Sequence, residues 1–256
     1  MKRIGIIGGM SYHSTLQYYE GINRIVNERS GGMTSADLVI RSVNFQQYYE
    51  WMQRDHWELI EKSLRNEAWK LSYEARCDYV AIATNTMHKV AECVEDMLSP
   101  PNYNRGDVRL VHIGDCVARK CYKAGIGRVA LLGTEFVMSE KFMKDRLRQN
   151  GLEVVDNFTE SEIREINRII FDELCHGKVT DKAVSAFLNI AYRANHRDIE
   201  SGNAGFDGVI LGCTELNMLV PNESIMVKPE YQSHFQFIDS TEAHIERLAE
   251  LCLYGG

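Results

Sequence analysis

Short segments rich in Val and Ile alternate along the chain with longer amphipathic segments. A parallel strand must be followed by a crossover that returns the chain to the same end of the sheet, and a helix is the usual crossover. The alternation therefore predicts an α/β fold in which helices cover mostly parallel sheets. Strands are expected at residues 3–7, 37–43, 79–83, 109–113, 128–132, 152–155, 208–211 and 235–238.

Helices are expected in most intervals between these strands, because amphipathic stretches of suitable length occur there. A cluster of Pro, Gly and Asn at residues 100–106 indicates a surface loop. The predicted helices cover residues 14–29, 57–76, 115–124, 139–149, 160–175, 181–201 and 241–251.

Two pairs of segments repeat within the chain. Residues 78–86 align without a gap on residues 207–215, and each copy begins with Asp, continues as a buried strand and ends in a short polar segment. Residues 3–9 match residues 128–134 at nearly the same offset. Any two buried strands of an α/β protein look alike, but two matches at similar spacing favour the duplication of one α/β unit.

A duplicated unit predicts two pseudo-symmetric three-layer α/β domains, each with a four-stranded sheet. We expect the first at residues 1–114 and the second at residues 115–239, with the final helix at residues 240–256 packing back on the first domain. Such sheets bind ligands at the carboxyl ends of their strands. The active site is therefore expected in an interdomain cleft, with Thr84 and Cys213 at equivalent positions on opposite walls.

The composition excludes several classes of partner and site. A net charge of −7 without runs of Lys or Arg argues against nucleic acid. No apolar stretch approaches the roughly 20 residues that a membrane helix needs, and the N-terminal apolar run is too short for a signal peptide. Seven cysteines without Cys-x-x-Cys or His-x-x-x-His spacing indicate free thiols and no metal site. We expect a soluble, cytoplasmic protein without a membrane partner.

Polar segments follow four of the predicted strands, where a helix is expected to begin. They offer backbone N–H groups, small hydroxyls and the positive end of a helix dipole, which together suit an anion. A carboxylate is favoured over phosphate, because the chain lacks a P-loop lysine motif and a Gly-x-Gly-x-x-Gly turn. Asn and Thr also serve as ordinary helix caps. The candidate ligand contacts are Met10, Ser11, Asn85, Thr86, Thr134 and Thr214.

Cys213 follows a glycine and precedes polar capping residues. A cysteine at a helix N-terminus has a lowered pKa, because the dipole and local N–H donors stabilise the thiolate. This predicts that Cys213 is partly ionised near neutral pH and acts as a nucleophile or a base. The alternative is a small buried hydrophobic residue, the usual role of a cysteine.

Motifs of a known family are spread over the whole chain: residues 8–11 with 14–15, 42–45, 84–88, 132–134, 212–216 and 238–241. In their order and spacing they resemble the aspartate/glutamate racemase family, and in particular its broad-specificity L-aspartate/glutamate racemases. The resemblance implies a racemase that needs no pyridoxal phosphate or other cofactor and binds a small acidic amino acid. It also implies two halves related by pseudo-twofold symmetry, and a homodimer.

The resemblance also implies the roles of the site residues. Cys213 is the main base that takes the α-proton of L-glutamate or L-aspartate, and Thr84 lies on the opposite face. Most of the family has Cys-Asn-Thr where this chain has residues 84–86. A threonine hydroxyl is almost never ionised near neutral pH, so Thr84 donates or relays a proton, and we expect a strong preference for one enantiomer. Glu215 is expected to contact the substrate.

Two further departures concern the substrate. Family members specific for aspartate often carry an arginine in the loop after the second strand, but here that loop, at residues 46–53, offers Gln53. Other members place a lysine late in a helix where this chain has residues 171–176, with Lys178 close by. The choice between aspartate and glutamate stays open. His88, one helical turn after Thr84, has either a structural role or one in proton transfer.

Two other functions stay open. One is a related one-cysteine isomerase, similar to maleate isomerase or hydantoin racemase, that acts on another small acid. The other is an amino-acid or dicarboxylate binding protein, in which the chemistry was lost when threonine replaced cysteine at position 84.

Overall fold

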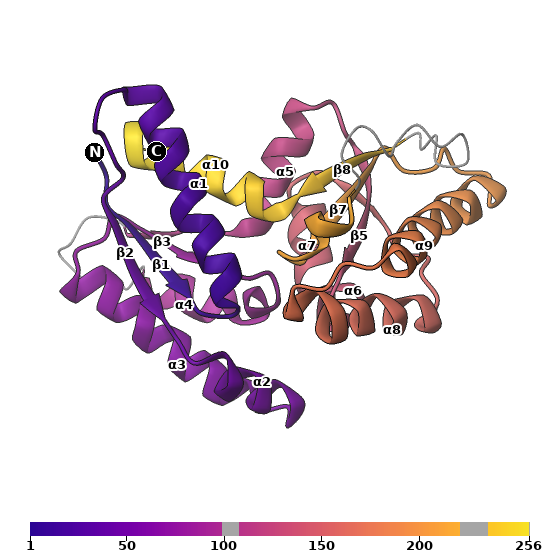
Figure 1. Cartoon of the computed structure of the whole chain (residues 1–256), viewed down its shortest axis with the longest axis horizontal. Coiled ribbons are helices and arrows are strands. Elements are labelled where there is room, and N and C mark those ends of the chain that lie inside the picture. The colour runs from indigo at the N-terminus through magenta and orange to yellow at the C-terminus, as the bar shows by residue number, and fades with distance from the viewer. Residues whose placement is uncertain (99–107, 221–234, 256) are drawn as a thin grey trace. The chain divides into compact units, whose positions relative to one another are not determined.

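The computed structural model describes residues 1–98, 108–220 and 235–255. The chain forms two compact units, one made of Met1–Cys116 with Thr241–Gly256 and the other of Val117–Ser240. Each unit contains a parallel four-stranded sheet with flanking helices (Figure 1). The predicted α/β fold with two parallel sheets is confirmed, and each predicted strand overlaps an observed one.

The first unit has the strand order β2-β1-β3-β4, and every neighbouring pair is parallel. Its last helix, α10, follows the second unit in sequence but lies beside α1 (Figure 1). The strands are β1 (Ile4–Gly8), β2 (Leu38–Ser42), β3 (Tyr79–Ile82) and β4 (Arg109–Leu110). The helices are α1 (Tyr12–Ser30), α2 (Phe45–Gln53), α3 (Trp57–Trp69), α4 (Ala91–Leu98) and α10 (Ser240–Tyr254), and α5 (Ile113–Lys123) crosses the boundary.

The second unit repeats this topology with the order β6-β5-β7-β8, again parallel throughout. Its core is formed by apolar side chains of β5 and β7 together with those of α8 and α9. The strands are β5 (Arg128–Gly133), β6 (Glu153–Val155), β7 (Gly208–Gly212) and β8 (Gln236–Asp239). The helices are α6 (Glu135–Ser139), α7 (Lys141–Gln149), α8 (Glu160–Arg168) and α9 (Asp181–Glu200).

The strand register explains the internal repeat. Ile4 pairs with Tyr79 in the first sheet, and Val129 pairs with Gly208 in the second. These four residues occupy matching positions in the two repeated segments. The inner strand pairs of the two sheets therefore have the same register, which favours duplication over a chance likeness of buried strands.

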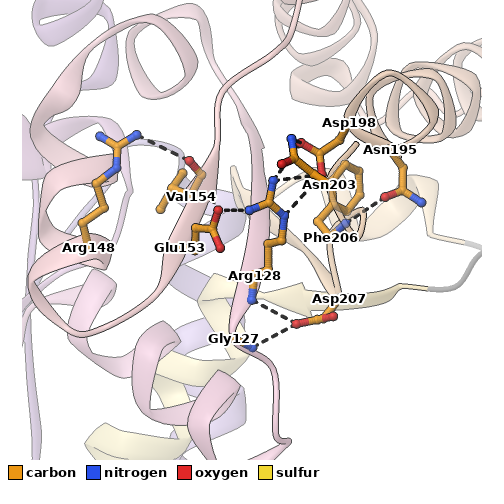
Figure 2. A network of polar contacts seen from close by, with 10 residues as sticks. All are labelled: Gly127, Arg128, Arg148, Glu153, Val154, Asn195, Asp198, Asn203, Phe206 and Asp207. Carbon is orange, nitrogen blue, oxygen red and sulfur yellow. Dashed lines mark hydrogen bonds and ion pairs between the residues drawn. The ribbon is translucent and has the colours of Figure 1, made fainter. Parts of the chain in front are cut away.

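The aspartate that opens each repeat has the same contact in both units. The Asp78 carboxylate accepts a hydrogen bond from the backbone N–H of Arg3 at 2.8 Å. The Asp207 carboxylate accepts one from the backbone N–H of Arg128 at 3.0 Å (Figure 2). Each aspartate thus fixes the start of its own strand against the start of the neighbouring strand.

A partly buried ion pair joins β5 to α9 in the second unit. The Arg128 guanidinium lies 2.8 Å from the Asp198 carboxylate and also contacts Glu153 (Figure 2). Only 16% of the Arg128 side chain and 5% of the Asp198 side chain are exposed. The Asn203 amide donates to the same carboxylate at 3.1 Å. Burial with several hydrogen bonds makes this pair sensitive to the loss of either partner.

Several predicted boundaries are wrong. Residues 46–53, expected as a loop, form α2, which Asn44 caps by accepting a hydrogen bond from the Gln46 N–H at 3.1 Å. The helix predicted at residues 57–76 changes from α3 into a π-helical turn, Lys70–Glu74. The helix predicted at residues 160–175 likewise ends in a π-helical turn, Ile169–Glu173, and a 3₁₀ turn, Leu174–His176. Helix α4 was not predicted, and the loop expected at residues 100–106 lies outside the described residues.

Helix α10 is held in the first unit by a fully buried histidine. The Tyr18 hydroxyl of α1 donates to His244 Nδ1, and His244 Nε2 donates to the Val111 carbonyl, both at 2.8 Å. At the other end of the helix, the Lys2 N–H donates to the Cys252 carbonyl at 2.7 Å. In the part of the chain that the structure describes, no helix is both long and apolar enough to cross a membrane.

Candidate active-site residues at the strand ends

The turn after β1 is shaped by Gly9. This residue has φ of 95°, and a Cβ there would lie 2.3 Å from the Val43 carbonyl oxygen, so only glycine fits. Its N–H donates to the Thr15 hydroxyl at 2.7 Å, and that hydroxyl donates to the Ser11 carbonyl at 3.0 Å. Met10 is buried, and Ser11 is the N-cap of α1. This turn therefore lies at the start of a long α-helix, as predicted.

Thr84 follows β3 at the same edge of the sheet. Ile7 pairs with Ile82, so Gly9 and Thr84 each come two residues after a paired position. The Thr84 side chain is half-buried. The residues at the ends of β1 and β3 are therefore neighbours, as expected for the carboxyl ends of parallel strands.

His88 supports the backbone of Thr84. Its Nδ1 lies 2.8 Å from the Thr84 carbonyl oxygen, and its Nε2 accepts from the Ile113 N–H at 3.2 Å. A carbonyl can only accept, so the ring proton is on Nδ1. Both ring nitrogens are engaged by backbone groups, which favours the structural role of His88 over proton transfer.

Asn85 and Thr86 are both buried, with 3% and 8% exposure. They lead into a 3₁₀ helix, Thr86–Val90, for which Asn85 occupies the N-cap position without making a side-chain capping bond. The simple capping role considered for Asn85 is therefore not the one seen.

In the second unit, Thr134 and Cys213 lie side by side in register. Gly133 pairs with Gly212, and the next residues of the two strands are Thr134 and Cys213. A Cβ on Gly212 would lie 2.9 Å from the Leu132 carbonyl oxygen, so a side chain there would crowd the adjacent strand. Both Thr134 and Cys213 are buried.

Cys213, Thr214 and Glu215 form one hydrogen-bonded cluster. The Cys213 thiol donates to Glu215 Oε2 at 3.1 Å, and the Thr214 hydroxyl donates to the same oxygen at 2.6 Å. The Glu215 residue is only 8% exposed. The Leu216 N–H donates to the Cys213 carbonyl at 3.2 Å, and this turn brings the Glu215 side chain back toward the thiol.

The prediction that Cys213 is partly ionised is wrong for this structure. Burial raises the pKa of the Cys213 thiol well above its usual value, and the negative charge of Glu215 raises it further. The element after β7 is a short 3₁₀ turn, Leu216–Leu219, so few peptide dipoles are aligned behind the thiol. The thiol is therefore protonated at neutral pH.

The length of the element that follows each strand also corrects the prediction that helix dipoles bind an anion at all four strand ends. Of the four strand-end turns, only the one after β1 leads directly into a long α-helix. Those after β3 and β7 lead into 3₁₀ helices, and Thr134 precedes α6, which has 5 residues. Individual N–H groups and hydroxyls, rather than helix dipoles, are what these three turns offer to a carboxylate.

Gln53 and Lys178 lie on the surface of their units. Gln53 is the exposed last residue of α2. Lys178 is also exposed, just after the 3₁₀ turn that ends the α8 segment.

The sequence analysis did not identify Cys175 as a residue near Cys213 and Glu215. The half-buried Cys175 packs against the core cluster that contains Cys213. Burial raises the pKa of Cys175 to about 12, and the charge of Glu215 adds to this. No local motif marks Cys175, so only the fold could reveal it. Within residues 1–98, 108–220 and 235–255, no group of three or more His, Cys, Asp or Glu side chains is suited to hold a metal ion.

Comparison with known proteins decides the family. The family model described as Asp/Glu/hydantoin racemase matches residues 7–248. The chain belongs to the Asp/Glu/hydantoin racemase family. The resemblance predicted from the motifs is therefore confirmed at the level of the family.

Solved structures of this racemase family resemble the chain over almost its whole length. A putative Asp/Glu racemase from Yersinia pestis is 31% identical with a TM-score of 0.83, and the match covers 99% of this chain and 100% of the other. An aspartate racemase homologue from Pyrococcus horikoshii is 34% identical with a TM-score of 0.76, with the same coverage. An aspartate racemase from Picrophilus torridus shares the fold at 18% identity and a TM-score of 0.63, covering 98% of this chain and 94% of the other. The family model and the two structures above 30% identity support a racemase-type function.

Proposed function

We propose that this protein is a cofactor-independent racemase that moves the α-proton of L-glutamate or L-aspartate. Cys213 is the main base, and Thr84 serves the opposite face of the substrate. The observation that carries the proposal is the equivalence of Thr84 and Cys213. Thr84 comes two residues after Ile82 and Cys213 two residues after Leu211, and these are equivalent paired positions in sheets of the same topology.

The remaining site residues bind the substrate carboxylates. Met10, Ser11, Asn85, Thr86, Thr134 and Thr214 belong to the strand-end turns, which present N–H groups and hydroxyls. The Thr214 hydroxyl donates to Glu215, so Thr214 would offer its backbone N–H. These donors stabilise the negative charge that develops when the α-proton leaves, which a cofactor-independent racemase needs because it works without an electron sink. Gln53 is proposed to bind the side-chain carboxylate of the substrate.

The two faces of the substrate should react at different rates. Once ionised, a thiol is a competent base, whereas a threonine hydroxyl is not. Removal of the proton from the L-amino acid by Cys213 should therefore be faster than removal from the D-amino acid on the Thr84 side.

Isotope exchange tests the proposal. The protein is incubated in D₂O with the L- and D-forms of aspartate and glutamate, and deuterium at Cα is followed by NMR. We expect exchange that prefers an L-form and is lost in Cys213→Ala. Cys93→Ala, which removes a half-buried thiol from the first unit, is the matched control and should keep the activity.

A binding protein is the second candidate, because burial and the charge of Glu215 raise the pKa of the Cys213 thiol and Thr84 is no base. Binding of L-glutamate that raises the melting temperature, without deuterium exchange from any of the four amino acids, would favour this function and contradict the racemase. Chiral analysis of the product separates complete racemisation from exchange on one face.

A further inference from the structure

The Cys213 thiol starts in the wrong protonation state for a base. Its hydrogen bond runs from Sγ to Glu215 Oε2, so the proton is on sulfur. Before or while Sγ takes the Cα proton, that first proton must leave. Its acceptor has to lie within hydrogen-bond distance of Sγ, because proton transfer needs this contact.

Glu215 meets this requirement. Its Oε2 lies 3.1 Å from Cys213 Sγ, and the carboxylate is buried with the thiol. The Thr214 hydroxyl donates to the same oxygen at 2.6 Å and thereby fixes the orientation of the carboxylate. A carboxylate that accepts the thiol proton has to face the thiol, so it does not face the substrate.

Resting on the proposed racemase function, we propose that Glu215 is a positioning residue that holds the Cys213 thiol and accepts its proton, and is not a substrate ligand. In the reaction, the Cα–H bond breaks as a new S–H bond forms, and the original S–H proton moves to Glu215 Oε2. The electron pair of the Cα–H bond remains on the substrate as a carbanion. The carbanion is then reprotonated from the Thr84 side. The proton on Glu215 passes to solvent water and the Thr84 side regains a proton from water, which restores the starting state.

Glu215→Gln separates this role from substrate binding. Glutamine keeps the size of the side chain but cannot take the proton. We expect kcat for exchange of the L-amino acid to fall about 100-fold or more, as is usual when an acid–base partner is lost, while KM changes less than about threefold. A loss confined to KM would overturn the proposal and return Glu215 to the substrate-binding residues.

The ionisation of Cys213 gives a readout that does not depend on activity. The pH at which Cys213 ionises is measured from the ultraviolet absorbance of the thiolate. The contribution of Cys213 is the difference between a protein with Cys213 and the matching protein with Cys213→Ser. The measurement is made once with Glu215 and once with Glu215→Gln. Among the described residues, the titratable groups that act on the pKa of this thiol are Glu215 and Cys175. Removal of the Glu215 charge should lower the pH at which Cys213 ionises, and an unchanged pH would overturn the contact.

Two controls isolate the charge. Glu160→Gln makes the same change at an exposed carboxylate that pairs only weakly with Arg164, at 3.3 Å, and should leave both readouts unchanged. Cys175→Ser removes a second thiol whose charge also raises the pKa of Cys213, but less than Glu215 does, so it should lower the pH at which Cys213 ionises by less than Glu215→Gln.

Thr214 provides a variant that alters no charge. Thr214→Val removes the 2.6 Å hydrogen bond, and we expect kcat to fall about tenfold because the carboxylate is no longer fixed. Thr214→Ser should restore most of the activity, and equal activity of the two variants would contradict the orienting role. If the wild-type protein exchanges none of the four amino acids, the proposed function fails, and the ionisation shift alone decides whether Glu215 holds the thiol.

Discussion

His244 makes the first unit sensitive to acid. Burial lowers the pKa of His244 to about 3, and the nearby His88 adds to the effect. Protonation would place a second hydrogen on a ring whose Nδ1 already accepts from Tyr18 and whose Nε2 donates to the Val111 carbonyl. The folded unit therefore keeps this histidine neutral.

The magnitude follows from proton linkage. Below its ordinary pKa of 6.5, His244 takes up a proton in the unfolded chain but not in the folded one until about pH 3. The stabilisation is therefore fully present above pH 6.5 and is lost as the pH falls. At about 1.4 kcal/mol for each tenfold change in proton affinity, the loss is roughly 2 kcal/mol between pH 6.5 and 5 and at most about 5 kcal/mol at pH 3.

His244→Gln tests this linkage. All three tryptophans, Trp51, Trp57 and Trp69, belong to the first unit, so their fluorescence reports its unfolding in urea. The variant should be less stable at pH 7.5, because the bond to Tyr18 is perturbed. Its unfolding free energy should nevertheless fall about 2 kcal/mol less than that of the wild type between pH 7.5 and 5.

His13→Gln is the matched control, because His13 is an exposed residue of the same unit. It should follow the wild-type dependence on pH. Parallel curves for His244→Gln and the wild type over this range would refute the assignment of the acid sensitivity to His244.

Two further predictions concern Arg128 and Thr84. Arg128→Ala leaves the Asp198 carboxylate buried without its ion pair and should destabilise the second unit by about 3–5 kcal/mol, measured by amide hydrogen exchange of β5 and α9. Arg3→Ala, at the matching and more exposed position, should have a much smaller effect. Thr84→Cys should accelerate α-proton exchange of the D-amino acid relative to wild type, because a thiol ionises far more readily than a hydroxyl, and an unchanged D-rate in a folded variant would contradict the role of Thr84.

The inner strands β1, β3, β5 and β7 were predictable because each is a short apolar run that is buried almost throughout. Helix α2 was missed because only Tyr48 and Met52 of its residues are buried, so the apolar periodicity is weak. Its N-cap, Asn44, was present in the sequence, but the aromatic residues that follow it do not distinguish a loop from a surface helix. Whether these residues form a helix thus depends on tertiary packing, which the local sequence pattern does not reveal.

The position of Cys213 was predictable, but its chemistry was not. The internal repeat placed it opposite Thr84 in the alignment, and the strand register agrees with that alignment. Its ionisation depends instead on burial, on the length of the element that follows and on the direction in which Glu215 points, and none of these follows from the motif alone.

The repeat also gives the asymmetry of the two units a physical basis. In the alignment, Thr84 corresponds to Cys213, and Thr86 corresponds to Glu215. The second unit therefore places a thiol two residues before a carboxylate, whereas the first places a hydroxyl two residues before another hydroxyl. A thiol that has to give up a proton benefits from a neighbouring acceptor, while a hydroxyl that only donates or relays a proton needs none. In the proposed racemase, the two differences between the units act in the same direction, and both favour removal of the α-proton of the L-amino acid on the Cys213 side.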